Sequence, residues 1–123
     1  DQASFGEKVR GAMNSKPIFF CGPTTLGELA ALFKKASLVI SNDSGPVHVA
    51  SGVGTPVISI FGRNQKGLSP ARWRPLGDRA VAIHKDVGCI ECLAHDCKKG
   101  FLCLKAITVE EVFEKAKNLL EKG

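Results

Sequence analysis

The chain has 123 residues, 44% of them hydrophobic, which is enough for one ordinary core and too few for two. Its formal charge of +5 suits an anionic ligand or an acidic lipid surface, but 17 basic against 12 acidic residues do not by themselves imply nucleic acid. No run approaches the roughly 20 apolar residues that span a bilayer, and the first residues lack the order of a signal peptide, so we expect a soluble chain.

Helical and strand-like patterns alternate from the start of the chain. The spacing of apolar residues predicts a helix that ends before Asn14–Pro17. The apolar run Ile18–Cys21, bounded by prolines and a glycine, predicts a strand buried on both faces of a parallel sheet. Thr25 and Glu28 then form a capping box that opens a second helix. The apolar face of this helix is expected to hold Leu26, Leu29, Ala30 and Phe33.

The middle of the chain predicts two further strands around a short helix. Leu38–Ser41 and Val57–Phe61 have the composition of buried strands, and Pro46–Val53 that of a short apolar helix. The residues from 62 to 79 are rich in glycine, proline, arginine and asparagine and show no period. A loop of this length is too long for a simple connector, so we expect it to be functional.

The last third returns to the same alternation. Ala80–Ile83 predicts a fourth strand, and Thr108 with Glu111 forms a second capping box before a closing helix. Strands that alternate with helices, without internal repeats, predict an α/β fold: one Rossmann-like domain over residues 1–123, a parallel sheet with helices on both faces. Ligands bind such sheets beyond the carboxyl ends of the strands, which directs attention to the loops after Cys21, Ser41 and Phe61.

The turn Ser41–His48 joins a buried strand to a helix and has the features of an anion site. The first backbone N–H groups of a helix lack intrahelical partners and point out of the sheet edge. Gly45 has no Cβ and lets a phosphate approach the main chain, while Pro46 fits the first helical turn. Ser44 can add a hydroxyl donor.

Two other residues of this turn suggest a sugar beside the phosphate. The carboxylate of Asp43 would repel a phosphate, so it should either cap the helix or accept hydrogen bonds from sugar hydroxyls, and we favour the sugar. His48 falls about one turn into the helix, within reach of the same ligand. Taken alone, however, the turn is also compatible with an ordinary helix cap and the histidine with a core residue.

Several short motifs follow one another in a fixed order across residues 17–113. They are Thr24-Thr25-Leu26, Glu28-Leu29, the run from Ser41 to Ala50, Gly54-Thr55-Pro56-Val57 and Phe61-Gly62. Together they resemble the glycosyltransferase family that contains the lipopolysaccharide heptosyltransferases. The resemblance implies a GT-B enzyme, in which two Rossmann-like domains face a cleft and the C-terminal one holds an ADP-linked sugar, typically ADP-heptose. The chain would then be that C-terminal domain, incomplete at its start, where Asp1 stands in place of an initiator methionine.

The resemblance also assigns roles to residues. It implies that Asp43 contacts sugar hydroxyls, that Ser44 and Gly45 bind the diphosphate, with Pro46 and His48 part of the same motif, and that Thr24, Thr25 and Leu26 line the adenine pocket. The family's Gly-Pro-Thr is replaced here by Gly62-Arg63-Asn64, so Arg63 either contacts a phosphate or is an ordinary surface arginine. The catalytic base is expected in the missing N-terminal domain.

The implied reaction transfers heptose to a lipopolysaccharide core or a related glycan. The expected partners are a nucleotide sugar, a glycolipid acceptor and the protein's own N-terminal domain, without nucleic acid. The sequence has no Asp-x-Asp metal clamp, so no cofactor is expected for transfer, and the isolated chain should be inactive. The expected location is the cytoplasm, at the inner face of the bacterial inner membrane. Another GT-B transferase, using a different nucleotide sugar, is the nearest alternative.

Four of the five cysteines cluster within the segment 85–107. Cys89, Cys92, Cys97 and Cys103 have spacing that could hold a structural zinc, although it is not that of a standard zinc ribbon. Free thiols, or disulfides formed during handling, are the alternatives.

The run Arg72-Trp73-Arg74 makes the long loop before this segment basic. Such a loop suits a phosphorylated acceptor or a membrane surface. The alternative is a solvated loop with Trp73 packed against the protein. If both features bind a partner, the chain would instead be a noncatalytic, metal-stapled interaction module.

Overall fold

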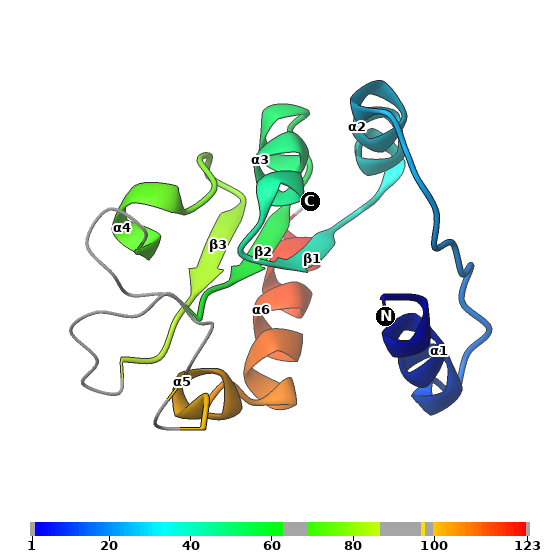
Figure 1. Cartoon of the computed structure of the whole chain (residues 1–123). Helices are drawn as coiled ribbons and strands as arrows, with labels where there is room; N and C mark the ends of the chain where they lie inside the picture. Colours follow the sequence, from blue (N-terminus) through cyan, green and yellow to red (C-terminus); the bar gives the residue numbers. More distant parts are fainter. Residues whose placement is uncertain (1, 63–68, 87–96, 98–99, 123) are drawn as a thin grey trace.

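The structure is a computed structural model that describes residues 2–62, 69–86, 97 and 100–122. Helices and strands alternate over most of this length (Figure 1). In chain order they are α1 (Gln2–Ala12), α2 (Leu26–Lys35), β1 (Val39–Asn42), α3 (Gly45–Gly52), β2 (Val57–Ile60), α4 (Pro70–Trp73), β3 (Ala80–Ile83), α5 (Leu102–Lys105) and α6 (Val109–Glu121). Among the described helices, none is both long and apolar enough to cross a bilayer.

The three strands form one parallel sheet in the order β1-β2-β3. Val39 pairs with Val57, which in turn pairs with Ala80, so the strands are in register and their carboxyl ends meet at one edge. The central strand β2 is buried along nearly its whole length, as expected for a parallel strand covered on both faces. The three predicted strands from residue 38 onwards are therefore confirmed, with ends that differ by at most one residue.

Helices cover both faces of the sheet, as predicted. On one face α2 and α3 lie side by side, and Val47 and Ala50 of α3 pack with Val39 and Val57 of the strands. The helix α6 lies on the other face (Figure 1). Its Leu119 packs with Ile58 and Ile83. The alternation of side chains along β2, with Val57 facing one layer and Ile58 the other, divides the core into these two clusters.

The strand predicted at Ile18–Cys21 is wrong. These residues are not part of the sheet, and the side chains of Ile18 and Phe20 are largely exposed. An apolar run becomes a strand only where a neighbouring strand completes its hydrogen bonds, and among the described residues the sheet ends at β1. Phe19 instead lies against α1, where the Arg10 guanidinium carbon is 5.2 Å from its ring centroid.

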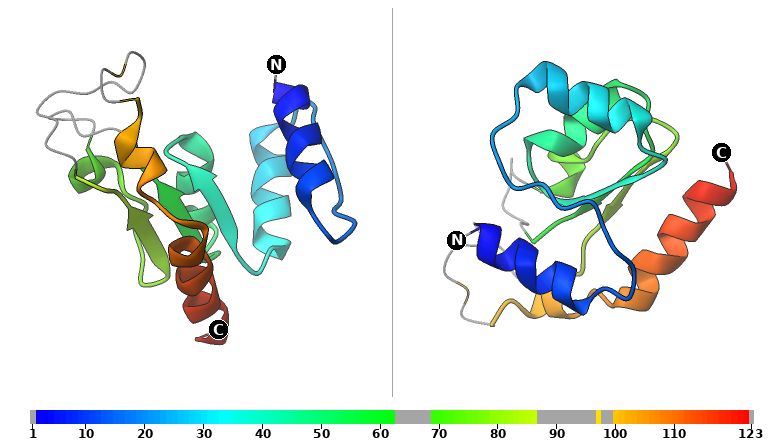
Figure 2. Two further views of the ribbon diagram at one scale, coloured as in Figure 1. Left: turned by 90° about the horizontal axis from the view of Figure 1, so that it is seen from below. Right: turned by 90° about the vertical axis from the view of Figure 1, so that its right-hand side faces the viewer.

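The first helix, α1, is formed as predicted but packs differently from the other helices. It lies beyond the β1 edge of the sheet (Figure 2). Its apolar residues Phe5 and Val9 remain mostly exposed. The predicted apolar face of α2 is only partly covered as well, since Leu26 is 71% exposed at its first turn. Hydrophobic surface that a core would normally cover thus gathers at this side of the sheet.

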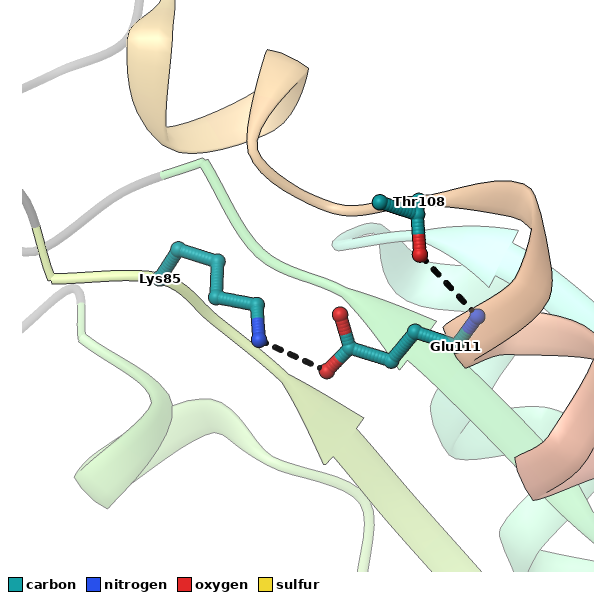
Figure 3. A network of polar contacts seen from close by, with 3 residues as sticks. All are labelled: Lys85, Thr108 and Glu111. Carbon is teal, nitrogen blue, oxygen red and sulfur yellow. Dashed lines mark hydrogen bonds and ion pairs between the residues drawn. The ribbon is translucent and has the colours of Figure 1, made fainter.

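The two predicted capping boxes have different outcomes. At α2 the box is complete: Glu28 N–H donates to the Thr25 hydroxyl at 3.1 Å, and Thr25 N–H donates to the Glu28 carboxylate at 2.9 Å. At α6 the Thr108 hydroxyl accepts from Glu111 N–H at 3.1 Å, but the Glu111 carboxylate turns to Lys85, 2.9 Å away (Figure 3). A cation after β3 therefore replaces the second half of the box and ties α6 to the sheet.

Candidate functional site

The turn after β1 is anchored at the carboxyl edge of the sheet. Asp43 N–H donates to the Ile60 carbonyl at 2.9 Å, which continues the β1 ladder one residue into the turn. Phe61 N–H donates to the Ile83 carbonyl at 2.8 Å and does the same one strand further along. The turn after β1 and the loop after β2 therefore start from one rigid edge, the place where this fold class binds ligands.

The start of α3 leaves a backbone donor available. Ser44 is the N-cap with extended backbone, yet its side chain makes no capping hydrogen bond. Its hydroxyl instead donates to the Asn42 carbonyl at 3.2 Å. Pro46 has no N–H, and Val47 N–H already donates to the Ser44 carbonyl at 3.2 Å. In the part of the chain that the structure describes, Gly45 N–H is thus the first-turn donor that no capping side chain takes.

Gly45 is a glycine that the chain itself does not require. A Cβ at this position would meet no atom within 4 Å, and its φ is outside the positive range in which glycine is favoured. The bare Cα at this exposed edge leaves room for a ligand to approach the backbone closely.

Asp43 and Ser41 belong to the same turn. Asp43 is half-buried between the end of β1 and the N-cap. Ser41 donates from its hydroxyl to the Asn42 carbonyl at 3.0 Å and lies 3.4 Å from the Ser44 hydroxyl. These short-range bonds fix the shape of the turn that carries Asp43 and Gly45. Helix capping by Asp43, one of the two roles considered from the sequence, is not observed, because the N-cap is Ser44.

His48 is exposed, in contrast to a core histidine. It follows Gly45 by three residues in α3, so both lie on one side of the helix. Its ring contacts the Trp73 ring in a T-shaped arrangement, with 6.2 Å between ring centroids and 64° between planes. The structure thus brings the basic loop and the turn together.

The predicted adenine-pocket residues lie at the start of α2. All three residues, Thr24, Thr25 and Leu26, are exposed, and the side chain of Thr25 takes part in the capping box. The Thr55 hydroxyl, just before β2, donates to the Phe33 carbonyl at 2.7 Å and pins the last turn of α2 to the amino edge of the sheet. The first turn of α2 is therefore the free end of a helix packed beside α3.

Some predicted site residues lie outside the described part of the chain. Arg63, Cys89 and Cys92 are in this group. The predicted phosphate contact of Arg63 and half of the predicted cysteine cluster therefore lie outside the described residues. Cys97 accepts a hydrogen bond from Phe101 N–H at 3.2 Å, while buried Cys103 donates its thiol to the Gly62 carbonyl at 3.8 Å. Within the described residues, no group of three or more metal-ligating side chains comes together.

The sequence matches a known family over most of its length. The family model described as "Glycosyltransferase family 9 (heptosyltransferase)" matches residues 2–102. The chain belongs to this family. The resemblance of its motifs to the lipopolysaccharide heptosyltransferases is thereby confirmed, and the reading as a noncatalytic, metal-stapled module is not favoured.

Curated members of glycosyltransferase family 9 align with nearly the whole chain. Lipooligosaccharide heptosyltransferase 2 of Campylobacter jejuni is 33% identical over 111 residues, covering 89% of this chain and 34% of the relative. The protein of the same name from Haemophilus influenzae is 33% identical and covers 95% of this chain and 34% of the relative. Lipopolysaccharide heptosyltransferase 3 of Escherichia coli is 33% identical, with 98% and 34% covered. The chain thus spans about a third of the length of the curated relatives it matches.

A solved structure of the same family shares the fold. The structure of Escherichia coli ADP-heptose lipopolysaccharide heptosyltransferase II superposes with a TM-score of 0.72 at 25% sequence identity, covering 97% of this chain and 33% of that one. The predicted α/β fold of GT-B type, a Rossmann-like parallel sheet with helices on both faces, is confirmed.

One part of the site in this family member was not predicted from the sequence. The short helix α4 interrupts the loop from 62 to 79 and brings Trp73 against His48. A local signal for the helix exists, because Ser69 followed by Pro70 is a typical N-cap and first helical residue. No local pattern indicates the contact, which joins residues far apart in the sequence.

Proposed function

We propose that this chain is the C-terminal, donor-binding domain of a heptosyltransferase, residues 1–123, with the segment 85–107 as a cysteine-rich segment within it. The full-length enzyme would transfer heptose from ADP-heptose to a lipopolysaccharide core or related glycan. The observation that carries this proposal is the start of α3 at the carboxyl edge of the sheet, where Ser44 gives the helix no side-chain cap and Asp43 immediately precedes this N-cap residue. A diphosphate needs N–H donors such as those of a helix start, and sugar hydroxyls need an acceptor such as a carboxylate.

Each donor-binding residue has a role in this proposal. Gly45 N–H and the Ser44 hydroxyl bind the diphosphate, and Pro46 shapes the turn without a competing N–H. Asp43 accepts hydrogen bonds from the sugar, and His48 reaches the diphosphate from the same side of α3. The free first turn of α2 borders the adenine, and a phosphate contact from the loop after β2 completes the set. The residues in these last two roles are Thr24, Thr25, Leu26 and Arg63.

The proposed reaction is a displacement at the anomeric carbon. An acceptor hydroxyl attacks, the bond to the diphosphate breaks, and ADP leaves with the negative charge that develops on its oxygens. The N-terminus of α3 carries a partial positive charge and stabilises that charge more in the transition state than in the ground state. The base that accepts the proton of the attacking hydroxyl would come from the N-terminal domain. Because the sequence lacks an Asp-x-Asp clamp, we propose transfer without a metal ion.

Loss of the Asp43 carboxylate should impair transfer strongly. With the full-length protein, ADP-heptose and a heptose-deficient lipopolysaccharide acceptor, we expect Asp43→Ala to lower kcat/KM by about two orders of magnitude, since it removes charge-assisted hydrogen bonds to the sugar. Asp78→Ala is the matched control, because Asp78 is an exposed carboxylate before β3, at the opposite edge of the sheet. Equal activity of both variants would contradict the role of Asp43. If the wild-type protein transferred only from another nucleotide sugar, ADP-heptose would be the wrong donor.

The proposed N-terminal part of the protein also has a place to dock. An apolar hollow of about 520 Å³ lies between the ends of β1 and β2 and the helices α5 and α6. Its lining includes Ile40, which is 49% exposed, and Phe113, which is 63% exposed. β1 is the edge strand of the described sheet next to this hollow. We propose that the preceding part of the full-length protein packs here, because its relatives are about three times as long.

A charge placed in this hollow should therefore harm only the longer protein. We expect Phe113→Lys to destabilise the full-length protein by at least about 2 kcal/mol, because a buried charge would face the docked segment, and to have little effect on residues 1–123 alone. Leu120→Lys is the control, since Leu120 is half-exposed on the same helix and does not line the hollow. Urea unfolding of both lengths measures the difference. An equal loss of unfolding free energy in the full-length protein and in residues 1–123 would contradict the docking role of the hollow.

The remaining partners follow from the same proposal. The acceptor would be a glycolipid, and the exposed Arg72 and Arg74 of the loop before β3 would face its phosphates or the membrane surface. This arrangement suits an enzyme of the cytoplasm that works at the inner face of the bacterial inner membrane.

Zinc content tests the cysteine-rich segment separately. The sulfur of Cys97 accepts a backbone N–H, as metal-bound thiolates do, whereas the thiol of Cys103 donates to a carbonyl, which a metal-bound thiolate cannot do. A structural zinc on Cys89, Cys92, Cys97 and Cys103 would give about one equivalent per chain of reduced protein, measured by elemental analysis. A value near zero would show that the cysteines bind no zinc and leave the transferase proposal untouched.

A further inference from the structure

The contact between His48 and Trp73 is part of a larger attachment between two segments. The Ser51 hydroxyl donates to the Leu76 carbonyl, and Pro75 between Trp73 and Leu76 is buried. His48 and Ser51 are three residues apart in α3 and therefore lie on one side of the helix. The segment from Trp73 to Leu76 thus runs along α3, and its two ends are held by that side of the helix.

A cation reinforces the position of Trp73. The guanidinium carbon of Arg72 lies 5.5 Å from the Trp73 ring centroid, within the range of a cation–π interaction. Backbone bonds also fix the short helix, because Trp73 N–H and Arg72 N–H both donate to the Ser69 carbonyl at 3.1 Å. Trp73 is 41% exposed, so its ring is only partly used in packing. The ring contacts both His48 and the guanidinium, so this cluster lies against the middle of α3.

An exposed histidine on a helix samples several rotamers, and binding a ligand through it costs the entropy of selecting one. A ring held by an aromatic neighbour has lost part of that freedom before the ligand arrives. His48 lies on the side of α3 that carries Gly45, the proposed diphosphate donor. Orientation of the imidazole therefore decides whether it reaches the diphosphate.

We propose that Trp73 is a positioning residue for His48: it holds the imidazole in the orientation from which its ring N–H donates to the diphosphate of the bound nucleotide. This inference rests on the proposed function and extends it to a residue outside the turn itself. Trp73 acts through His48 and needs no contact with the ligand. Its effect on affinity should therefore disappear when His48 is absent.

A double-mutant cycle with ADP measures this dependence. In calorimetric titrations of the full-length protein, we expect His48→Ala and Trp73→Ala each to weaken ADP binding by roughly three- to tenfold. The double variant should bind no more weakly than His48→Ala, and Trp73→Phe should stay close to wild type because phenylalanine keeps a T-shaped contact. If the two losses multiply, Trp73 acts independently of His48 and the inference is overturned. An unchanged affinity of Trp73→Ala overturns it as well.

Two controls separate this inference from folding and from the proposed function. Leu76→Ala removes a side chain that is exposed in the same segment and should leave ADP affinity unchanged, while thermal melts of each variant confirm that titrations are made on folded protein. Gly45→Ala belongs in the same series. If wild type binds ADP and Gly45→Ala does not, the donor site stands, and unchanged His48→Ala and Trp73→Ala affinities refute the diphosphate contact of His48 and the positioning role of Trp73. If wild type does not bind ADP, the proposed function itself has failed.

Discussion

Gly45→Ala is expected to weaken ADP binding to the full-length protein by at least about tenfold without destabilising the fold. The added Cβ meets no atom of the described chain within 4 Å, and the backbone there has no positive φ, so the protein accommodates alanine freely. Alanine should even raise the free energy of unfolding by about 0.4–1 kcal/mol, because it restricts the unfolded chain. A diphosphate oxygen in contact with the Gly45 backbone would, in contrast, meet the new methyl group.

Gly52→Ala provides the matched control for this prediction. Gly52 ends the same helix, its Cβ would likewise meet nothing within 4 Å, and it lies at the end of α3 away from the turn. Calorimetry with ADP and urea unfolding of both variants give the two quantities needed. A loss of affinity in both variants, or in neither, would show that the start of α3 does not hold the nucleotide.

Phe61→Ala is expected to cost the fold about 3–5 kcal/mol, a large part of the stability of a small domain. Phe61 is fully buried where β2 ends, its carbonyl lies 3.2 Å from His84 Nδ1, and its N–H extends the ladder to β3. Truncation would leave a cavity beneath the site edge. Urea unfolding measures the cost as a shift in midpoint at constant slope.

Phe61→Leu is the control for this second prediction. Leucine keeps most of the volume, so we expect a loss of less than about 1.5 kcal/mol. Equal and small losses for both variants would show that the end of β2 is not the packed base on which the site is built.

Local patterns were sufficient to predict the elements that make their own contacts. Thr25 and Glu28 satisfy each other within one turn, so the capping box at α2 could be predicted from spacing alone. At α6 the same spacing is present, yet the Glu111 carboxylate forms an ion pair with Lys85, which follows β3. The run Ile18–Cys21 failed for a related reason, because composition records hydrophobicity and not the neighbouring strand that pairing requires.

The candidate site, too, could be predicted only in part from local patterns. The position of the turn followed from the rule that ligands bind beyond the carboxyl ends of parallel strands, and the structure places Asp43 and Gly45 at that edge. The sequence could not show that Ser44 leaves the helix uncapped or that Gly45 has empty space around it. The contact of His48 with Trp73 depends on tertiary packing and has no local signal.

Calorimetric titration of ADP and ADP-heptose into the full-length protein tests the donor site most directly. We expect both to bind, ADP-heptose more tightly because Asp43 accepts from its sugar, and we expect Asp43→Ala to remove that difference while ADP itself still binds. Absence of measurable binding of either compound to the wild-type protein at millimolar concentration would contradict the assignment of the turn from Ser41 to His48 as a nucleotide-sugar site.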